Sequence, residues 1–171
     1  TLNGNGGTLP NGTSFTVTYK SGNYNDLSWN IPTRTNYKFN GFYTAASGGT
    51  QIYNSSGKVV NDGTYWSGSV LVYPGNHTLY AQWTLNQVTL SYNANGGNGA
   101  PTNQTKTYNQ ALTLSSIEPT RTGYTFLGWS TDSNATSATY SAGGSYTSNE
   151  STTLYAVWKI NTYTISYKKK K

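Results

Sequence analysis

Short stretches of alternating apolar and polar residues, separated by turns rich in glycine and asparagine, run along the whole chain. Gln87 to Tyr92 (QVTLSY) is one such stretch, and it leads into the turn sequence Asn95-Gly96-Gly97. Alternation with a period of two is typical of β-strands, and no stretch places apolar residues at helical spacing over three turns. The pattern therefore predicts a β-rich fold, either all-β or α+β with minimal helix.

The same pattern occurs twice in the sequence. The segment IPTRTNYKFNGF at 31–42 corresponds to EPTRTGYTFLGW at 118–129, and TLYAQW at 78–83 corresponds to TLYAVW at 153–158. A sequence that repeats at a fixed spacing indicates repeated structural units, each with its own small core. We therefore expect two tandem modules.

The boundary between the modules is expected at Thr84 to Gln87, with module one at 1–84 and module two at 85–159. A connection this short is no flexible linker. The copies differ in length between the third and closing strands, and module one carries about 12 extra residues there. Because this stretch contains Asn61-Asp62-Gly63, a turn signal, we expect an inserted hairpin at about 51–73.

Each module is expected to contain a hairpin closed by its Asn-Gly-Gly turn, then a third strand and a closing strand. In the third strand of module two apolar residues occupy both faces, which predicts a strand covered on both sides or twisted at Gly128. The expected strands after the first are Ser14 to Tyr19, Asn36 to Tyr43, Thr105 to Leu114, Gly123 to Ser130 and Leu154 to Trp158.

The first strand of the repeat is displaced. Module one lacks most of it, whereas TYTISY at 162–167 repeats the QVTLSY pattern with no further repeat behind it. Residues 160–167 are therefore interpreted in two ways, as the first strand of a following repeat or as a donor strand that completes a neighbouring identical subunit. The side chains expected to carry such self-assembly are Ile160, Tyr163, Ile165 and Tyr167.

Composition supports a folded β-rich chain with little charge. Aromatic residues make up 15% and charged residues 9%, and cysteine is absent. The net charge of +6 owes much to a tail, Lys168 to Lys171, without which seven basic residues face five acidic ones. Because no basic residues are interleaved with aromatic ones, nucleic acid is not an expected partner. No apolar run is long enough to cross a membrane, so membrane insertion is not expected either.

The residues needed for catalysis are sparse. The chain has one histidine, His77, in a turn that module two does not share, and its five acidic residues show no paired spacing. An active site needs converging titratable groups. The sequence therefore predicts no enzyme, no metal site and no cofactor.

Three motifs, in this order, resemble the Listeria–Bacteroides repeat, also called the internalin B-repeat, of bacterial surface proteins. They are N-G-G after the first strand, P-T-R-x-G-Y-x-F-x-G-W, and T-L-Y-A-x-W at the close. Module two carries all three, whereas module one has Asn36 in place of glycine and Phe42 in place of tryptophan. The resemblance implies a β-grasp-like module of about four strands, a bacterial cell-surface or secreted location, and a non-catalytic role as stalk, spacer or adhesion unit.

The motif residues also have a structural reading of their own. Proline fixes the entry into the third strand, arginine can hydrogen-bond loop carbonyls or a carboxylate, and tryptophan fills a small core. The residues predicted to act in this way are Pro32, Arg34, Tyr37, Trp83, Pro119, Arg121, Tyr124, Trp129 and Trp158.

Three aromatic residues have no counterpart in module two: Trp29, Tyr65 and Trp66. Aromatic faces flanked by short polar side chains hold sugars, so these residues are the candidates for a ligand site. The expected partners are other repeats of the same protein or identical subunits head-to-tail, with a host or matrix glycan or protein as a further possibility. The function expected first is a stalk, spacer or adhesion unit of an extracellular bacterial surface protein. A fibre subunit assembled through 160–167 and a glycan-binding module are the alternatives.

Overall fold

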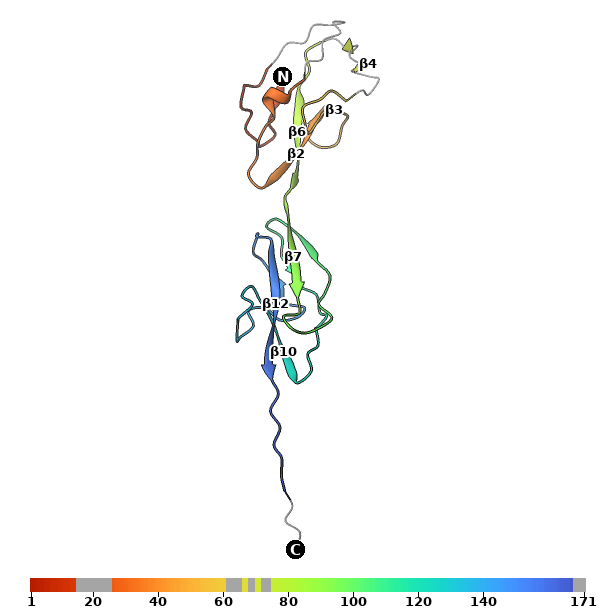
Figure 1. The fold of residues 1–171 in the computed structure, drawn as a ribbon. Coiled ribbons are helices and arrows are strands. Elements are labelled where there is room, and N and C mark those ends of the chain that lie inside the picture. Colours follow the sequence, from red (N-terminus) through yellow and green to blue (C-terminus); the bar gives the residue numbers. More distant parts are fainter. Residues whose placement is uncertain (15–25, 61–65, 68–69, 72–74, 168–171) are drawn as a thin grey trace. The chain divides into compact units, whose positions relative to one another are not determined.

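The chain divides into two compact units, Thr1–Asn86 (unit 1) and Gln87–Lys171 (unit 2). A computed structural model describes residues 1–14, 26–60, 66–67, 70–71 and 75–167. Strands dominate this part of the chain, and its one helical element is a single 3-10 turn, η1 (Ser28–Asn30) (Figure 1). The β-rich fold with minimal helix that the sequence predicts is confirmed.

Unit 1 is built on a four-stranded mixed sheet in the order β1-β6-β2-β3. The strands are β1 (Leu2–Asn3), β2 (Tyr37–Tyr43), β3 (Gln51–Asn54) and β6 (Leu79–Leu85). The opening strand β1 pairs in parallel with β6, whereas β2 is antiparallel to both β6 and β3. The first and last strands of the unit are therefore neighbours.

The main sheet of unit 2 has the order β10-β12-β7-β8, which keeps the closing strand between the opening and third strands but places the fourth strand beside the opening strand. The opening strand β7 pairs in parallel with the closing strand β12, which pairs antiparallel with β10 on its other side. A second, two-stranded sheet pairs β9 with β11. The bounds are β7 (Gln87–Asn93), β8 (Gln104–Thr107), β9 (Leu112–Thr113), β10 (Tyr124–Ser130), β11 (Ser145–Tyr146) and β12 (Thr152–Ile160).

The third strand of each unit bulges at its glycine. The register with the closing strand shifts between Phe39 and Gly41 in β2, and between Phe126 and Gly128 in β10. A Cβ atom on Gly128 would lie 2.4 Å from the carbonyl oxygen of Tyr140. Bulges bend and twist a strand, and this one explains why apolar residues fall on both faces of the sequence pattern.

Each unit has its own apolar core. In unit 1 the core contains Phe39, Phe42 and Tyr53, and in unit 2 it contains Tyr92, Trp129 and Tyr146. Edge-to-face contacts join the rings, with centroids 5.1 Å apart for Phe39 and Phe42 and 4.9 Å for Tyr92 and Trp129. Such aromatic pairs stabilise a core by about 0.5–1.5 kcal/mol beyond the area they bury.

The predicted hairpin strand at Thr105 to Leu114 is wrong in its extent. The chain breaks into β8 and β9 at a turn in which Gln110 N–H donates to the Thr107 carbonyl oxygen, and Asn109 has a φ of 58°. The connection from β7 to β8 also runs beyond the Asn-Gly-Gly turn, because Asn98 forms a β-bridge with Thr120 before the chain returns. The turn therefore faces the Pro-Thr-Arg segment. The corresponding strand of unit 1, Ser14 to Tyr19, lies almost wholly outside the described residues.

The inserted stretch of unit 1 contains more than one hairpin. Its first part, β3, joins the main sheet against β2, and Val59 bridges back to Tyr53. Farther along, β4 (Trp66–Ser67) pairs antiparallel with β5 (Val70–Leu71). The Asn-Asp-Gly turn signal at 61–63 lies outside the described residues.

Candidate functional site

The Asn-Gly-Gly turn of each unit has positive φ at its first two residues. Asn5 and Gly6 have φ values of 47° and 85°, and Asn95 and Gly96 have 50° and 85°. Hydrogen bonds close the turns, from Gly7 N–H to the Gly4 carbonyl at 2.8 Å and from Gly97 N–H to the Ala94 carbonyl at 2.9 Å. Asparagine and glycine are the residues that adopt this conformation at least cost.

The asparagine side chain also ties the turn to the rest of its unit. In unit 2 the Asn95 side-chain N–H donates to the carbonyl oxygens of Ser133, at 2.8 Å, and Ala156, at 3.0 Å. In unit 1 Asn5 donates likewise to Ala46 and Ala81, both at 2.9 Å. This role of the asparagine is absent from the sequence-based prediction, although its repetition in both copies could have pointed to it.

A tryptophan of the closing strand packs on the turn. Trp83 Nε1 donates to the Gly4 carbonyl at 3.1 Å, and Trp158 Nε1 donates to the Ala94 carbonyl at 3.0 Å. A Cβ atom on Gly7 would lie 2.3 Å from the Trp83 ring, and one on Gly97 would lie 2.5 Å from the Trp158 ring. The last glycine of the motif is therefore required, because the indole ring occupies the space that a side chain at this position would need.

The arginine of the Pro-Thr-Arg segment lies on the other side of the motif. The guanidinium Cζ of Arg34 is 3.9 Å from the ring centroid of Tyr37, and that of Arg121 is 3.9 Å from the ring centroid of Tyr124. Stacking of this kind is worth about 0.5–1 kcal/mol at an exposed site. Arg34 Nη1 is also 3.4 Å from the Asn5 carbonyl oxygen, while Pro32 and Pro119 are buried beside these segments.

In unit 2 the structure thus brings together the proline, arginine, tyrosine and closing-strand tryptophan of the predicted motif. In unit 1 Arg34 and Trp83 lie against successive glycines of the same turn. Trp129 stands apart from this group, fully buried in the core of unit 2. Trp29 lies in η1 with its side chain 48% exposed. The side chains of Tyr65 and Trp66 lie outside the described part, so the aromatic ligand site stays a prediction.

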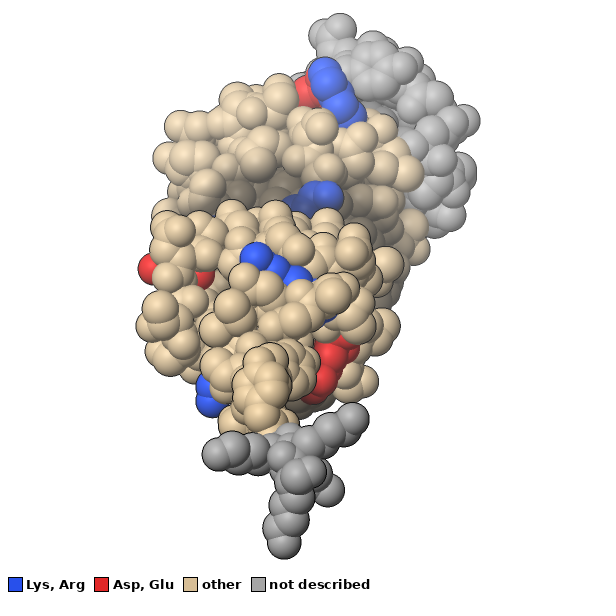
Figure 2. All heavy atoms as spheres, turned by 60° about the horizontal axis from the view of Figure 1, so that its bottom comes forward, with Lys and Arg blue, Asp and Glu red and all other residues tan. Residues whose placement is uncertain are grey.

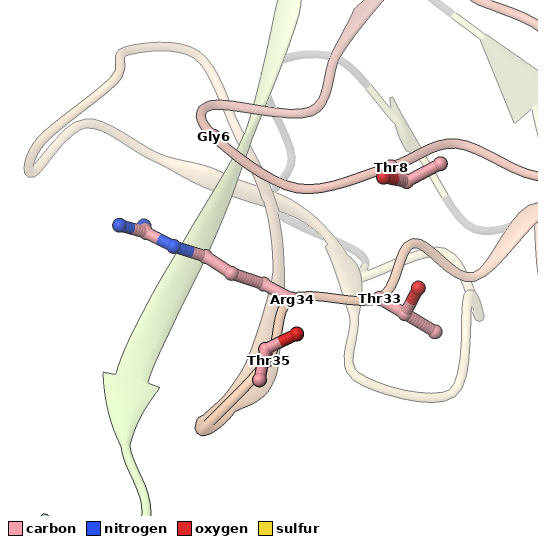
Figure 3. Close-up of a pocket in the computed structure, with 5 residues that line it drawn as sticks. All are labelled: Gly6, Thr8, Thr33, Arg34 and Thr35. Carbon is pink, nitrogen blue, oxygen red and sulfur yellow. The ribbon is translucent and has the colours of Figure 1, made fainter.

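A hollow lies beside the arginine in each unit. In unit 1 it has a volume of about 440 Å³ and is lined by Gly6, Thr8, Thr33, Arg34 and Thr35 (Figure 3). In unit 2 it measures about 350 Å³, and its lining includes Asn98, Glu118, Thr120, Arg121 and Thr122. Among the described residues, neither guanidinium lies within 4 Å of a carboxylate. The two hollows lie beside equivalent arginines of the repeat and are candidates for a binding site.

The predicted self-assembly segment is mostly unpaired. Ile160 is the last residue of β12, where it pairs with Tyr124, so the segment without a strand partner begins at Asn161 and not at Ile160. Beyond it, Tyr163, Ile165 and Tyr167 are 81%, 76% and 92% exposed. Asn161 N–H donates to the Gly123 carbonyl oxygen, which anchors the start of the segment to unit 2.

A buried lysine in unit 2 is a further feature of the structure. Lys106 is 1% exposed, and its Nζ donates to Asn149 Oδ1 at 2.7 Å and to the Thr107 carbonyl at 3.3 Å. Asn109 holds the Asn149 amide in place, through its own N–H and its side-chain oxygen, both at 2.8 Å. These bonds join β8 to the loop that precedes β12.

Few groups suited to chemistry converge in the described residues. They contain no cluster of three or more His, Cys, Asp or Glu side chains with the geometry of a metal site. Charged side chains lie scattered over the largely neutral surface drawn in Figure 2. Within the same residues, no helix is both long and apolar enough to span a membrane.

Comparison with known proteins identifies the family of the chain. A protein of Evansella cellulosilytica, named as a Gly-rich membrane protein, is 31% identical over 138 residues, which cover 78% of this chain and 15% of that protein. Internalin H of Listeria monocytogenes is 35% identical over 98 residues, or 57% of this chain and 15% of that protein. No solved structure is significantly similar to the chain. The model of the Listeria-Bacteroides repeat domain matches residues 1–82 and 89–157, so the chain belongs to this family, as its motifs predict.

Proposed function

We propose that the chain is a non-catalytic stalk or spacer segment of an extracellular bacterial surface protein, built from β-grasp-like modules in series. Its relatives carry the names of an internalin and of membrane proteins, and the chain covers only a small part of their length. The parallel pairing of the first and last strands, with antiparallel strands on either side, supports the β-grasp-like assignment.

The observation that carries the proposal is the connection between the units. β6 ends at Leu85 and β7 begins at Gln87, so a single residue, Asn86, separates the closing strand of one unit from the opening strand of the next. The Asn86 N–H donates to the Asn36 carbonyl at 2.9 Å. A connection with so few free torsions suits a spacer better than a tether.

The same connection recurs after β12. Asn161 occupies the position of Asn86, and its N–H donates to the Gly123 carbonyl at 2.9 Å. Thr162 to Tyr167 then follow the pattern of Gln87 to Tyr92, in which Val88, Leu90 and Tyr92 are buried. We therefore assign 162–167 as the first strand of a further module of the same kind.

The fibre alternative assigns the same strand to another molecule. The exposure of Tyr163, Ile165 and Tyr167 supports it equally, because an unpaired segment with an apolar face can add to the open edge of another sheet. The two readings differ in what completes the strand: a module that follows in the same chain, or a second copy of the chain.

The experiment extends the chain after Tyr167 with a second copy of residues 93–161 and measures amide hydrogen exchange at 163–167. The stalk proposal predicts protection comparable to that of 88–92, and a monomer at every concentration. The substitution Ile165→Asp in the extended chain should unfold the added module and leave unit 2 intact. Residues 163–167 that stay unprotected in the extended chain would refute the assignment. Concentration-dependent assembly of the original chain, lost on deletion of 162–167, would favour the fibre.

A further inference from the structure

The guanidinium of Arg34 is held in place but has most of its hydrogen-bonding capacity unused. Its carbon lies over the Tyr37 ring, and a Cβ atom on Gly6 would lie 3.3 Å from it. Arginine has five N–H donors, and Arg34 makes one long bond of 3.4 Å, to the Asn5 carbonyl oxygen. A planar fork that is fixed by its surroundings and has free donors suits a carboxylate.

The rest of the same hollow is lined by hydroxyl groups. Figure 3 shows the Arg34 side chain extending away from Thr8 and Thr33, which lie on the opposite side, while Thr35 lies below Arg34. All three threonines are exposed, and none of their hydroxyls forms a hydrogen bond with another described residue. The hollow therefore offers a fixed cation on one side and three hydroxyl groups, each able to donate and accept a hydrogen bond, along the rest of its lining.

We propose that the hollow beside Arg34 binds a uronic acid unit of an acidic polysaccharide. A uronic acid has a carboxylate at one end and hydroxyl groups around the rest of its ring, which is the polarity of this hollow. The carboxylate binds the Arg34 fork, and the ring hydroxyls hydrogen-bond to Thr8, Thr33 and Thr35. This site is distinct from the aromatic one predicted at Trp29, Tyr65 and Trp66.

The corresponding hollow of unit 2 has one difference that opposes an anion. Glu118 lines it together with Arg121, whereas unit 1 has Ile31 at the equivalent position of the repeat. A carboxylate near the arginine repels a second one and competes for the same donors. We therefore expect the Arg34 site to bind more tightly than the Arg121 site, which provides a comparison within one molecule.

The test is an NMR titration of the whole chain with galacturonate, with galactose and acetate as controls. Saturable shifts of the Arg34 side-chain N–H and of the Thr35 amide with galacturonate, and much weaker ones with galactose or acetate, are expected. Thr35→Val should weaken binding about threefold or more, as expected for the loss of one hydrogen bond. The matched variant Thr122→Val in unit 2 should leave the unit 1 titration unchanged.

Two further variants change the charged side chains of the hollows. Arg34→Lys keeps a cation but loses the two parallel donors of the guanidinium, so it should weaken binding several-fold. If that variant fails to fold, the loss of binding is measured in Thr8→Val and Thr35→Val instead. Glu118→Gln should tighten binding at the Arg121 site roughly two- to fivefold, the range of an exposed charge interaction. No saturable shift in unit 1, or equal shifts with acetate and galacturonate, would overturn the proposal.

Discussion

The indole Nε1 of Trp158 donates a hydrogen bond to the carbonyl oxygen of Ala94 at 3.0 Å, and this contact positions the ring over the Asn-Gly-Gly turn. Trp83 and Gly4 repeat the contact at 3.1 Å in unit 1. In both units a side chain of the closing strand thus fastens the loop that follows the opening strand. The motif residues are far apart in sequence because they belong to the first and last strands of a unit, which pair side by side in one small sheet.

Gly97→Ala should destabilise unit 2 by about 2–3 kcal/mol, because its methyl group would overlap the Trp158 ring and the Thr120 carbonyl, 2.5 and 2.7 Å away. The measurement is chemical unfolding, with amide protection of β7 and β12 as the probe of unit 2. Gly99→Ala is the matched control: its φ is 78°, but no atom lies within 4 Å of the added carbon, so only backbone strain of about 1 kcal/mol is expected. Equal losses in the two variants would contradict the role of the indole ring.

The strands and the repeat could be predicted from the sequence because both depend on local patterns. Alternation located β7, and the repeated motifs located β10 and β12. A twist at Gly128 was one of the two explanations for the apolar residues on both faces of β10, and the strand bulges there. The break between β8 and β9 could not be predicted in the same way. It depends on Asn109, whose amide partner Asn149 is distant in sequence.

The same limit applies to the candidate site. The sequence marked the Pro-Thr-Arg segment as special, but the hollow beside Arg34 requires the turn at Gly6 to lie against it. That contact follows from the bridge between Thr8 and Thr33, which no periodicity encodes. The burial of Lys106 could not be predicted either, since an alternating strand gives no sign that a lysine points inward.

Asn149→Ala should destabilise unit 2 by about 2–4 kcal/mol, because the buried ammonium of Lys106 would lose its closest acceptor, now 2.7 Å away. Lys106→Met keeps the apolar stem and removes the charge, so its stability should stay within about 1 kcal/mol of the parent chain. The double variant should be more stable than Asn149→Ala alone when all are compared by chemical unfolding. Additive losses in this cycle would mean that the two side chains are not coupled.

The stability of unit 1 should fall in alkaline solution. Burial raises the pKa of the Tyr53 phenol above its ordinary value of 10.0, and the Asp26 carboxylate raises the pKa further. Above pH 10 the unfolded chain releases this proton while the folded unit retains it, so the free energy of unfolding decreases as pH rises. The slope approaches about 1.4 kcal/mol per pH unit for this one group.

The check on this pH dependence is unfolding of the parent chain and of Tyr53→Phe at several pH values from 9 upward, with amide protection in β2 and β6 as the probe. Removing the phenol should flatten the profile of unit 1. Tyr92 of unit 2 is left unchanged and gives an internal reference. Burial raises the pKa of its phenol, while the hydrogen bond with the Ser115 N–H lowers it. A parent profile no steeper than that of Tyr53→Phe would exclude Tyr53 as the cause.

Asn95 combines two contributions that a pair of substitutions can separate. Asn95→Gly keeps the ability to adopt a φ of 50° and removes the hydrogen bonds to Ser133 and Ala156, so a loss of about 1–3 kcal/mol is expected. Asn95→Ala removes the same bonds and adds the strain of a left-handed backbone, about 1 kcal/mol more. Chemical unfolding of both variants measures the difference. If alanine and glycine were equally harmful, the turn would have relaxed to another conformation, and the hydrogen bonds alone would explain why the repeat begins its turn with asparagine.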